Sequence, residues 1–530
     1  MRLLSVVLFA AALALPTVAS AGEPTYNTVK LSGANGSTEP RMAVGRDDAR
    51  WVVTNGAGGE VVYVSRDQGR TWTKSEGLPP QKKASIDVDF VTMPTGRILS
   101  SELDYGGLNF PTGYSDDQGK TWTESVGATE LADQDRQWFA VGPVPKGSPK
   151  GTQPPVYLLY HNFASGIPQH NMWVATSNDG GATFGPPVPT AQPGSEAYQD
   201  LQCSDSGGPS SITVNPDTGH IYVVFTTRAG KVPGTDVDTG GCGASVFGPL
   251  EFNIVNGTRV WVADSATGAP GTWHDSLAVD RSDTGQVVSQ QLAYGALDNK
   301  GNFYVAYPES PKPYPNIDGS GVKLTWQQPL PDGSLDTRWS KPVTLVPYSF
   351  DGGDTDKPIN GSTLVHLVAG DPGKLALAYF KSETVTGAKA PVWYTHVMQI
   401  LKGQSQDPQI RDQKIAGPGG GPPVPTYQWT NSQMMGICSS TPVIQGVENG
   451  LNCSRSTDVW GITLDRQCRV SITWPARGST GDGGTKQPNA TIPNADNGTF
   501  VTTQTGGDDL CAKKDALPGG SLALPWQTLG

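Results

Sequence analysis

The sequence predicts an all-β chain in which four-stranded antiparallel sheets pack radially into one closed β-propeller. Three observations support this fold: one turn motif occurs three times, a strand–turn–strand unit recurs seven times, and turn-forming residues are abundant. The chain has 66 Gly and 44 Pro among 530 residues, a content that is rich in turns but below that of low-complexity chains. Radial packing of sheets lets a long all-β chain avoid exposed edge strands.

The turn motif has the pattern S-x-D-x-G-x-T-[W/F] and occupies residues 65–72, 115–122 and 177–184. In this pattern the Asp can accept backbone N–H bonds and hold a tight turn, while the Gly permits positive φ. The aromatic residue can pack beneath a hairpin. We therefore expect each copy to connect two strands, and we interpret its Asp as a turn former rather than a catalyst.

The strand–turn–strand unit consists of an inner strand, a turn and a second strand. The two strands of the seven copies are expected at 41–44 and 51–53, 86–90 and 97–99, 138–141 and 156–160, 211–214 and 221–225, 291–294 and 303–307, 363–366 and 375–379, and 459–462 and 470–474. Residues 28–31 precede the first copy and are placed to complete the last sheet beside residues 500–503. This predicts seven blades closed by the N-terminal strand.

The three turns resemble the Asp box, or BNR repeat, of sialidases and related secreted β-propellers. Segments 271–273 and 338–340 resemble remnants of the same box in other blades. The resemblance implies a propeller fold and a function directed at glycans. Sialidases have six blades, so six is the alternative number if one unit is misread.

The N-terminus is typical of a secretory signal, with Arg2, an apolar run from Leu3 to Leu15 and an A-x-A cleavage site at 19–21. We therefore expect a signal peptide over 1–21 and a single secreted propeller domain over 22–530. No later stretch is apolar for long enough to predict a membrane span.

Charge and composition indicate the class of partner. The net charge is −11 and the pI is near 5.1, which argues against a protein that binds nucleic acid phosphates. The expected partner is an extracellular glycan or glycoconjugate, bound by a monomer without a cofactor. Asp351, Asp354 and Asp356 are close enough in sequence to chelate a structural Ca²⁺, although a solvated turn is the favoured interpretation.

The six Cys of an exported chain predict up to three disulfides. The expected position of each Cys on the propeller favours the pairs Cys203–Cys242, Cys438–Cys453 and Cys468–Cys511. The first two pairs would lie on the face where the inner strands begin, and the third on the opposite face. Because the chain has no C-x-x-C pair, zinc and thioredoxin-like sites are not indicated.

The face where the inner strands begin is expected to carry the functional site, because charged and polar residues gather there although charges are sparse in the chain. The candidate catalytic residues are Asp135, Glu102, Asp104 and Tyr105. The candidate substrate-binding residues are Arg41, Arg136, Trp138, His161 and Glu309. The alternatives are a solvated polar face and, for the arginines, structural salt bridges such as Arg136 with Asp133 or Asp135.

Two segments of this face resemble sialidase elements. Arg41-Met42-Ala43 resembles the Arg-Ile-Pro motif whose arginine binds the sialic acid carboxylate, but without the proline. The segment 135–141 resembles a D-R-x-W element of bacterial BNR proteins. The sialidase catalytic acid is an Asp before the first box, whereas residues 54–60 contain only Glu60. Tyr105 with Glu102 could form the tyrosine–glutamate pair, but in a different blade.

Two functions follow from these patterns. The favoured one is a secreted, sialidase-like, exo-acting glycoside hydrolase on extracellular glycans, which needs an acid and a nucleophile or base. The alternative is a non-catalytic propeller that binds carbohydrate or protein through the same face. The missing Asp before the first box favours binding or a different glycosidase chemistry.

Overall fold

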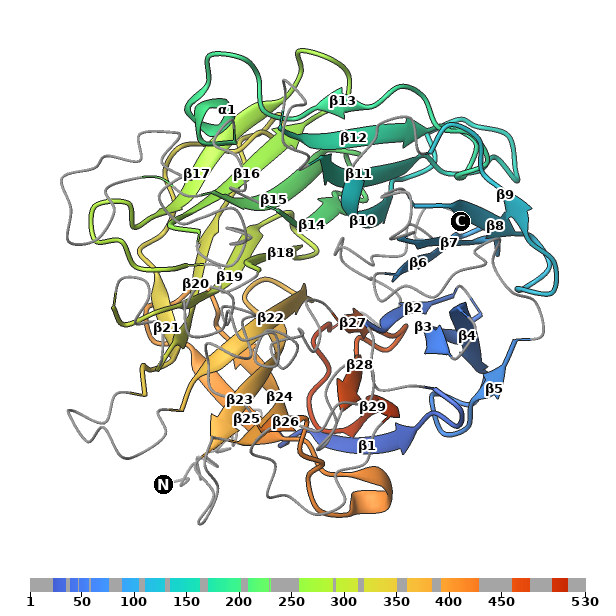
Figure 1. Ribbon diagram of the computed structural model, residues 1–530, viewed down its shortest axis with the longest axis vertical. Coiled ribbons are helices and arrows are strands. Elements are labelled where there is room, and N and C mark those ends of the chain that lie inside the picture. The colour runs from blue at the N-terminus through green and yellow to red at the C-terminus, as the bar shows by residue number, and fades with distance from the viewer. Residues whose placement is uncertain are drawn as a thin grey trace, which may run out of the picture.

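The computed structural model describes residues 22–34, 39–45, 47–56, 59–75, 88–103, 110–128, 134–162, 170–201, 208–227, 229, 257–288, 292–312, 319–349, 360–383, 392–428, 460–476 and 498–512. These residues form seven antiparallel sheets arranged in a ring, with the first strand of each unit nearest the centre (Figure 1). The predicted all-β propeller with seven blades is confirmed, and the six-bladed alternative is wrong.

The blades follow one another in chain order. Blade 1 contains β2 (Arg41–Val44), β3 (Arg50–Gly56), β4 (Gly59–Ser65) and β5 (Thr73–Lys74). Blade 2 contains β6 (Val88–Thr92), β7 (Ile98–Glu102), β8 (Thr112–Ser115) and β9 (Thr123–Glu124). Blade 3 contains β10 (Gln134–Val141), β11 (Val156–Asn162), β12 (Met172–Ser177) and β13 (Val188–Pro189), and the short helix α1 (Glu196–Leu201) follows it.

The remaining blades keep the same order from the centre outward. Blade 4 contains β14 (Pro209–Val214), β15 (Ile221–Thr227), β16 (Arg259–Ser265) and β17 (His274–Asp280). Blade 5 contains β18 (Tyr294–Leu297), β19 (Phe303–Glu309), β20 (Gly321–Gln327) and β21 (Val343–Val346). Blade 6 contains β22 (Ser362–Ala369), β23 (Leu375–Glu383), β24 (Val392–Leu401) and β25 (Gln409–Lys414), and β26 (Tyr427–Gln428) also pairs with β24.

Blade 7 closes the ring with strands from both ends of the described chain. Its order is β27 (Gly461–Leu464), β28 (Val470–Ala476), β29 (Gly498–Gly506) and β1 (Thr25–Lys30), with β1 antiparallel to β29 (Figure 1). The Thr28 and Thr502 hydroxyls lie 3.0 Å apart across this pair. The predicted closure by the N-terminal strand is confirmed, and β1 supplies the fourth, outermost strand of the last blade.

Neighbouring blades share apolar cores because successive side chains of a strand point to opposite faces. Trp138 on β10 packs with Ile212 in a core between blades 3 and 4. The next residue, Phe139, packs with Val91 in a core between blades 2 and 3. One strand therefore contributes to two cores, which is why the inner strands read as nearly continuous apolar runs.

Two inner strands begin later than the sequence indicates. β18 begins at Tyr294 rather than Gln291, and β27 begins at Gly461 rather than Val459. An apolar pattern indicates which residues are buried but not where a strand begins. Leu292 and Ala293, for example, are buried although they precede β18. The start of the strand is instead set by pairing with β19, from Tyr294 onward.

The turn motif forms the same hydrogen bonds in all three copies. In the first copy, Asp67 Oδ1 accepts the Thr71 backbone N–H at 2.9 Å and the Ser65 hydroxyl at 2.8 Å. The Gly69 N–H donates to Ser65 Oγ at 2.9 Å, and Gly69 has a φ of 83°. The corresponding bonds recur in the second and third copies with distances between 2.7 and 2.9 Å. The prediction that these Asp residues act as turn formers fits this geometry.

These turns lie on the face opposite the beginnings of the inner strands. Arg50, at the start of β3, donates to the Gln68 carbonyl at 2.8 Å, and Arg97, just before β7, donates to the Asp179 carbonyl at 2.9 Å. Both arginines follow the turn between the first and second strands of a blade. We call this end of the propeller the lower face, and the end where the inner strands begin the upper face.

Asp117→Asn is expected to lower the melting temperature near neutral pH and to have little effect in acid. The backbone N–H and hydroxyl of Thr121, and then the Ser115 hydroxyl, hold the pKa of Asp117 at about 2, below its usual value. A carboxylate whose pKa is depressed by folding stabilises the native state above its unfolded pKa of about 4. That stabilisation is lost as the pH falls toward the folded pKa of about 2.

Thermal unfolding measured at pH 7 and again near pH 2 tests this expectation. The exposed Asp217 lies in a different turn, so Asp217→Asn is the charge-matched control. An Asp117→Asn difference from wild type that is unchanged at the two pH values would contradict the role of the ionised Asp in the turn.

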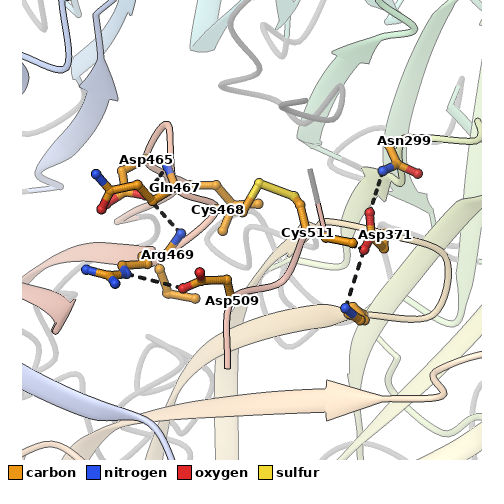
Figure 2. The surroundings of a disulfide bond; sticks show 12 residues. Asn299, Asp371, Asp465, Gln467, Cys468, Arg469, Asp509 and Cys511 are labelled. Carbon is orange, nitrogen blue, oxygen red and sulfur yellow. Dashed lines mark hydrogen bonds and ion pairs between the residues drawn. A yellow bond between two sulfur atoms is a disulfide. The ribbon is translucent and has the colours of Figure 1, made fainter. Parts of the chain in front are cut away.

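A disulfide joins Cys468 and Cys511 on the lower face (Figure 2). The segment beyond β29 crosses this face, where the Leu510 N–H donates to the Cys468 carbonyl and the Leu510 carbonyl accepts the Asp371 N–H at 2.8 Å. Asp371 also accepts from Asn299 at 2.6 Å, which connects the segment to blades 6 and 5. The third predicted pair is confirmed, while Cys203, Cys242, Cys438 and Cys453 lie outside the described residues.

Replacing both Cys468 and Cys511 by Ser is expected to lower the free energy of unfolding by roughly 3–4 kcal/mol, mainly by releasing a constraint on the unfolded chain. Denaturant unfolding with and without a reductant measures the effect. The double variant should be insensitive to reductant, and a variant as stable as the oxidised wild type would contradict the expectation.

Several other predictions fall outside the described residues. These are the signal segment 1–21, the carboxylates Asp351, Asp354 and Asp356, and the candidate catalytic residues Asp104 and Tyr105. Within the described part of the chain, no cluster of three or more His, Cys, Asp or Glu is placed to hold a metal ion. The helices found there are too short or too polar to cross a membrane.

Candidate functional site

A group of carboxyl side chains lies between blades 1 and 2 at the upper face. Glu60 is near the beginning of β4, the third strand of blade 1, and Glu102 ends β7, the second strand of blade 2. Third strands begin and second strands end at the upper face, so the topology places both side chains there. Ser100 on β7 donates a short hydrogen bond to Glu60 Oε1, which ties the two blades together.

The Glu60 carboxyl is buried and only partly hydrogen-bonded. Glu60 is 3% exposed and Glu102 is fully buried. Besides the Ser100 bond to Oε1, Oε2 of Glu60 has no hydrogen-bond partner among the described residues. Burial, followed by the nearby charge of Glu102 and then that of Asp89, raises the pKa of Glu60 well above its usual value, and the Ser100 hydroxyl opposes this only in part.

This environment favours the protonated form of Glu60, because an ionised carboxylate would be costly beside a second carboxyl in a buried site. A protonated acid with an unpartnered oxygen can donate a proton to a group that enters the site. A carboxyl pair in which one member is held neutral is the arrangement used for general acid catalysis.

Arg41 pairs with Asp89, whose charge acts on Glu60, and further contacts within the fold hold its guanidinium in place. Its Nε donates to Asp89 Oδ1 at 3.0 Å, and both side chains are at most 4% exposed. Its Nη1 donates to the Trp460 carbonyl at 3.3 Å, and its guanidinium lies 4.4 Å from the ring centroid of Trp138. Arg41 therefore contacts blades 2, 3 and 7 from its position on blade 1.

Contacts of this kind link each blade to the next around the axis. In blade order they are Arg41–Asp89, Asp89–Phe139, Trp138–Pro209, Ser211–Gly295, Tyr294–His366, His366–Trp460 and Trp460–Arg41. These contacts, several of them made by backbone groups, connect each blade to the next all the way around the axis. The orientation of Arg41 and Asp89 is consequently set by the whole ring rather than by blades 1 and 2 alone.

Strained backbone positions two of these axial side chains. Arg136 has a φ of 56° and Leu364 a φ of 54°, each within an irregularity of the pairing between the first two strands of its blade. Left-handed conformations are costly for such residues and persist only where the surrounding structure imposes them. Trp138 and His366 each come two residues later and reach the axis. Burial and then the charge of Arg41 lower the pKa of His366 to about 3.

Two of the other sequence-predicted residues, His161 and Glu309, have contacts of their own away from Arg41. His161 on β11 is buried with its ring 5.8 Å from that of His170. Burial and then the neighbouring His161 lower the pKa of His170 to about 3. Arg136 is also buried. Asp135 belongs to β10, but its side chain lies outside the described residues.

Glu309 lies between blades 4 and 5. Its carboxylate pairs with Arg281 at 2.9 Å and with Lys323 at 2.7 Å, and it accepts the Tyr348 hydroxyl. The charge of Glu309 is therefore balanced within its own cluster. Of the predicted binding residues, the structure brings Arg41 and Trp138 together and connects Arg41 to the carboxyl pair through Asp89.

Three residues of the site were not among the sequence candidates: Glu60, Ser100 and Asp89. Glu60 carried a signal, because it is the only acidic residue in the stretch where the Asp-box resemblance expects a catalytic acid. Asp89 was less distinctive in the sequence, where it is a charged residue within an apolar strand that is buried in the structure. Nothing in the sequence pointed to Ser100, since a serine in a strand is not distinctive.

Comparison with known proteins finds no matching family model and no matching curated protein. The fold is similar to that of the α-L-arabinofuranosidase Arb93A of Fusarium graminearum, with a TM-score of 0.39 and 12% identity over 71% of this chain and 97% of that one. An ulvan lyase of polysaccharide lyase family PL25 matches with a TM-score of 0.42 and 11% identity, over 75% of this chain and 97% of the lyase. The α-L-arabinanase of Penicillium chrysogenum matches with a TM-score of 0.37 and 10% identity, over 80% of this chain and 93% of the arabinanase.

Proposed function

We propose that the protein is a secreted glycoside hydrolase whose reaction takes place at the carboxyl pair of blades 1 and 2. The observation that carries the proposal is Glu60, a buried carboxyl with a raised pKa, an unpartnered oxygen among the described residues and a second carboxyl, Glu102, as its neighbour. Glycosidases use two carboxyl groups in these two states.

In this proposal Glu60 is the general acid. Held protonated by burial and by Glu102, it donates its proton to the oxygen of the leaving group as the glycosidic bond breaks. Glu102 supplies the second carboxyl, either as a nucleophile that attacks the anomeric carbon or as a base that activates water. Ser100 orients Glu60 through its hydrogen bond to Oε1.

Arg41 and Trp138 are proposed to border the sugar site, and Arg136, His161 and Glu309 to lie farther around the upper face. The resemblance of the three turns to Asp boxes supports a secreted, glycan-directed propeller. The exo-acting mode, and the roles of Asp135, Asp104 and Tyr105, remain predictions from the sequence.

A non-catalytic glycan-binding propeller is the second candidate. One observation favours it: Glu60 and Glu102 are both almost completely buried, whereas a catalytic carboxyl must reach the substrate. In a binding protein the same pair would serve to hold blades 1 and 2 together.

Assay of the purified protein on a panel of aryl glycosides and oligosaccharides separates the two candidates. Turnover that is lost in Glu60→Gln and in Glu102→Gln, with an unchanged circular dichroism spectrum, supports the hydrolase. Glycan binding without turnover of any substrate supports the binding propeller and overturns the proposed reaction.

A further inference from the structure

The cation that pairs with Asp89, beside the carboxyl pair, is already neutralised. Arg41 forms a buried ion pair with Asp89, and its guanidinium is stacked against Trp138 and bonded to the Trp460 carbonyl. To bind a substrate carboxylate through two parallel hydrogen bonds, Arg41 would have to leave partners on three other blades. Such a move would break the circle of axial contacts.

Three described cations farther around the upper face are also paired. Arg281 and Lys323 share Glu309, at 2.9 and 2.7 Å. Arg259, at the start of β16, pairs with Asp280 at 3.2 Å and with Glu196 at 2.6 Å. Arg281 and Lys323 share one carboxylate, so their cluster keeps one positive charge in excess, but both cations lie at blades 4 and 5 and not at the carboxyl pair of blades 1 and 2.

The carboxyl pair itself has an excess of acidic groups. Glu60, Glu102 and Asp89 lie together, and Glu39, which comes just before β2, is buried and adds its charge near Arg41. A sugar carboxylate bound here would stand beside the charge of Glu102, and like charges in a buried site are unfavourable. The net charge of −11 adds long-range repulsion of anionic polysaccharides.

We infer that the sugar bound at the Glu60–Glu102 pair is neutral, recognised through its hydroxyl groups, and is neither a uronide nor a sialoside. This inference rests on the proposed function and specifies its substrate class. Carboxyl groups accept and, when protonated, donate hydrogen bonds to hydroxyls, so an acidic site with paired cations suits a neutral glycan.

Matched pairs of substrates that differ only in a carboxylate test the inference. The pairs are p-nitrophenyl glucosides with glucuronides and galactosides with galacturonides, in both anomeric forms, together with an aryl sialoside. The neutral member of an accepted pair should have a kcat/KM at least about tenfold higher, the factor expected from roughly 1.4 kcal/mol of charge repulsion. A higher kcat/KM for the uronide, or turnover of the sialoside alone, overturns the inference and leaves the hydrolase standing.

If no substrate is turned over, the proposed reaction is wrong. The preference for a neutral sugar is then tested by measuring glycan binding. Wild-type protein titrated calorimetrically with neutral and uronic oligosaccharides of equal length should bind the neutral ones. If the protein prefers the uronic oligosaccharides, or binds neither kind, the inference that the bound sugar is neutral is wrong.

Asp89→Asn provides a second readout, because it keeps the side-chain shape but removes the charge that neutralises Arg41. The ratio of kcat/KM for the glucoside to that for the glucuronide should fall by about tenfold, through the attraction of the released guanidinium. The control is Asp47→Asn, which removes the exposed partner of Arg66 on the lower face and should leave the ratio unchanged. An unaltered ratio in a folded Asp89→Asn variant argues against the inference, and if that variant does not fold, the wild-type panel decides.

Discussion

Glu60→Gln is expected to reduce kcat for glycoside hydrolysis by about 10²- to 10⁴-fold, the usual contribution of a general acid. Glutamine preserves the size of the side chain and can accept the Ser100 hydrogen bond, but it cannot give a proton to the leaving group. The loss should therefore be large for substrates with poor leaving groups and small for dinitrophenyl glycosides, whose leaving group needs no protonation. Steady-state kinetics on the two substrate classes measures this difference.

The pH profile provides an independent check of the same role. Because burial and Glu102 raise the pKa of Glu60, wild-type activity should persist above the usual titration range of a glutamate and fall only as the pH rises past that raised pKa. This alkaline limb should be absent in Glu60→Gln. The control is Glu124→Gln on the exposed strand β9, which should retain wild-type kinetics. Equal losses for both leaving groups would contradict an acid role for Glu60.

Arg50→Ala is expected to lower the free energy of unfolding by about 3–5 kcal/mol, because it leaves a buried carboxylate without its cation. Arg50 on blade 1 pairs with Asp465 on blade 7 at 2.6 Å, and both side chains are 1% exposed. Arg50 also donates to the Thr503 hydroxyl at 3.1 Å on β29, the strand that pairs with the N-terminal strand. The variant thus weakens the joint at which the ring closes.

Urea unfolding followed by tryptophan fluorescence measures this loss, and a nearby surface pair provides the control. Arg66 and Asp47 also belong to blade 1 and lie 2.8 Å apart, but they are 49% and 51% exposed. Arg66→Ala should cost only about 0–1 kcal/mol, since exposed ion pairs contribute little. Similar effects of the two variants would show that burial of the Arg50–Asp465 pair does not determine its contribution.

The features that the sequence predicted correctly depend on local patterns. The three turns are recognisable because Ser, Asp, Gly and Thr satisfy one another within a few residues, as the bonds around Asp67 show. The strands are recognisable from apolar runs between turn formers. Repetition then makes the number of blades countable, and closure by residues 28–31 follows because the last unit otherwise lacks its fourth strand.

The site depended on contacts that no local pattern contains. Glu60 and Ser100 lie 40 positions apart and on different blades, and they meet only because blades 1 and 2 pack side by side. Arg41 was recognisable as an arginine at the head of a strand, but its pairing with Asp89 required the neighbouring blade.

By itself, then, the sequence determined the type, number and order of the blades, because hydrogen bonding and burial within each blade act between residues close in the chain. Only the tertiary structure decided which carboxyl has a raised pKa and which arginine is neutralised. The physical reason is that both properties depend on burial and on charges brought together from different blades, and these arise only when the ring has closed.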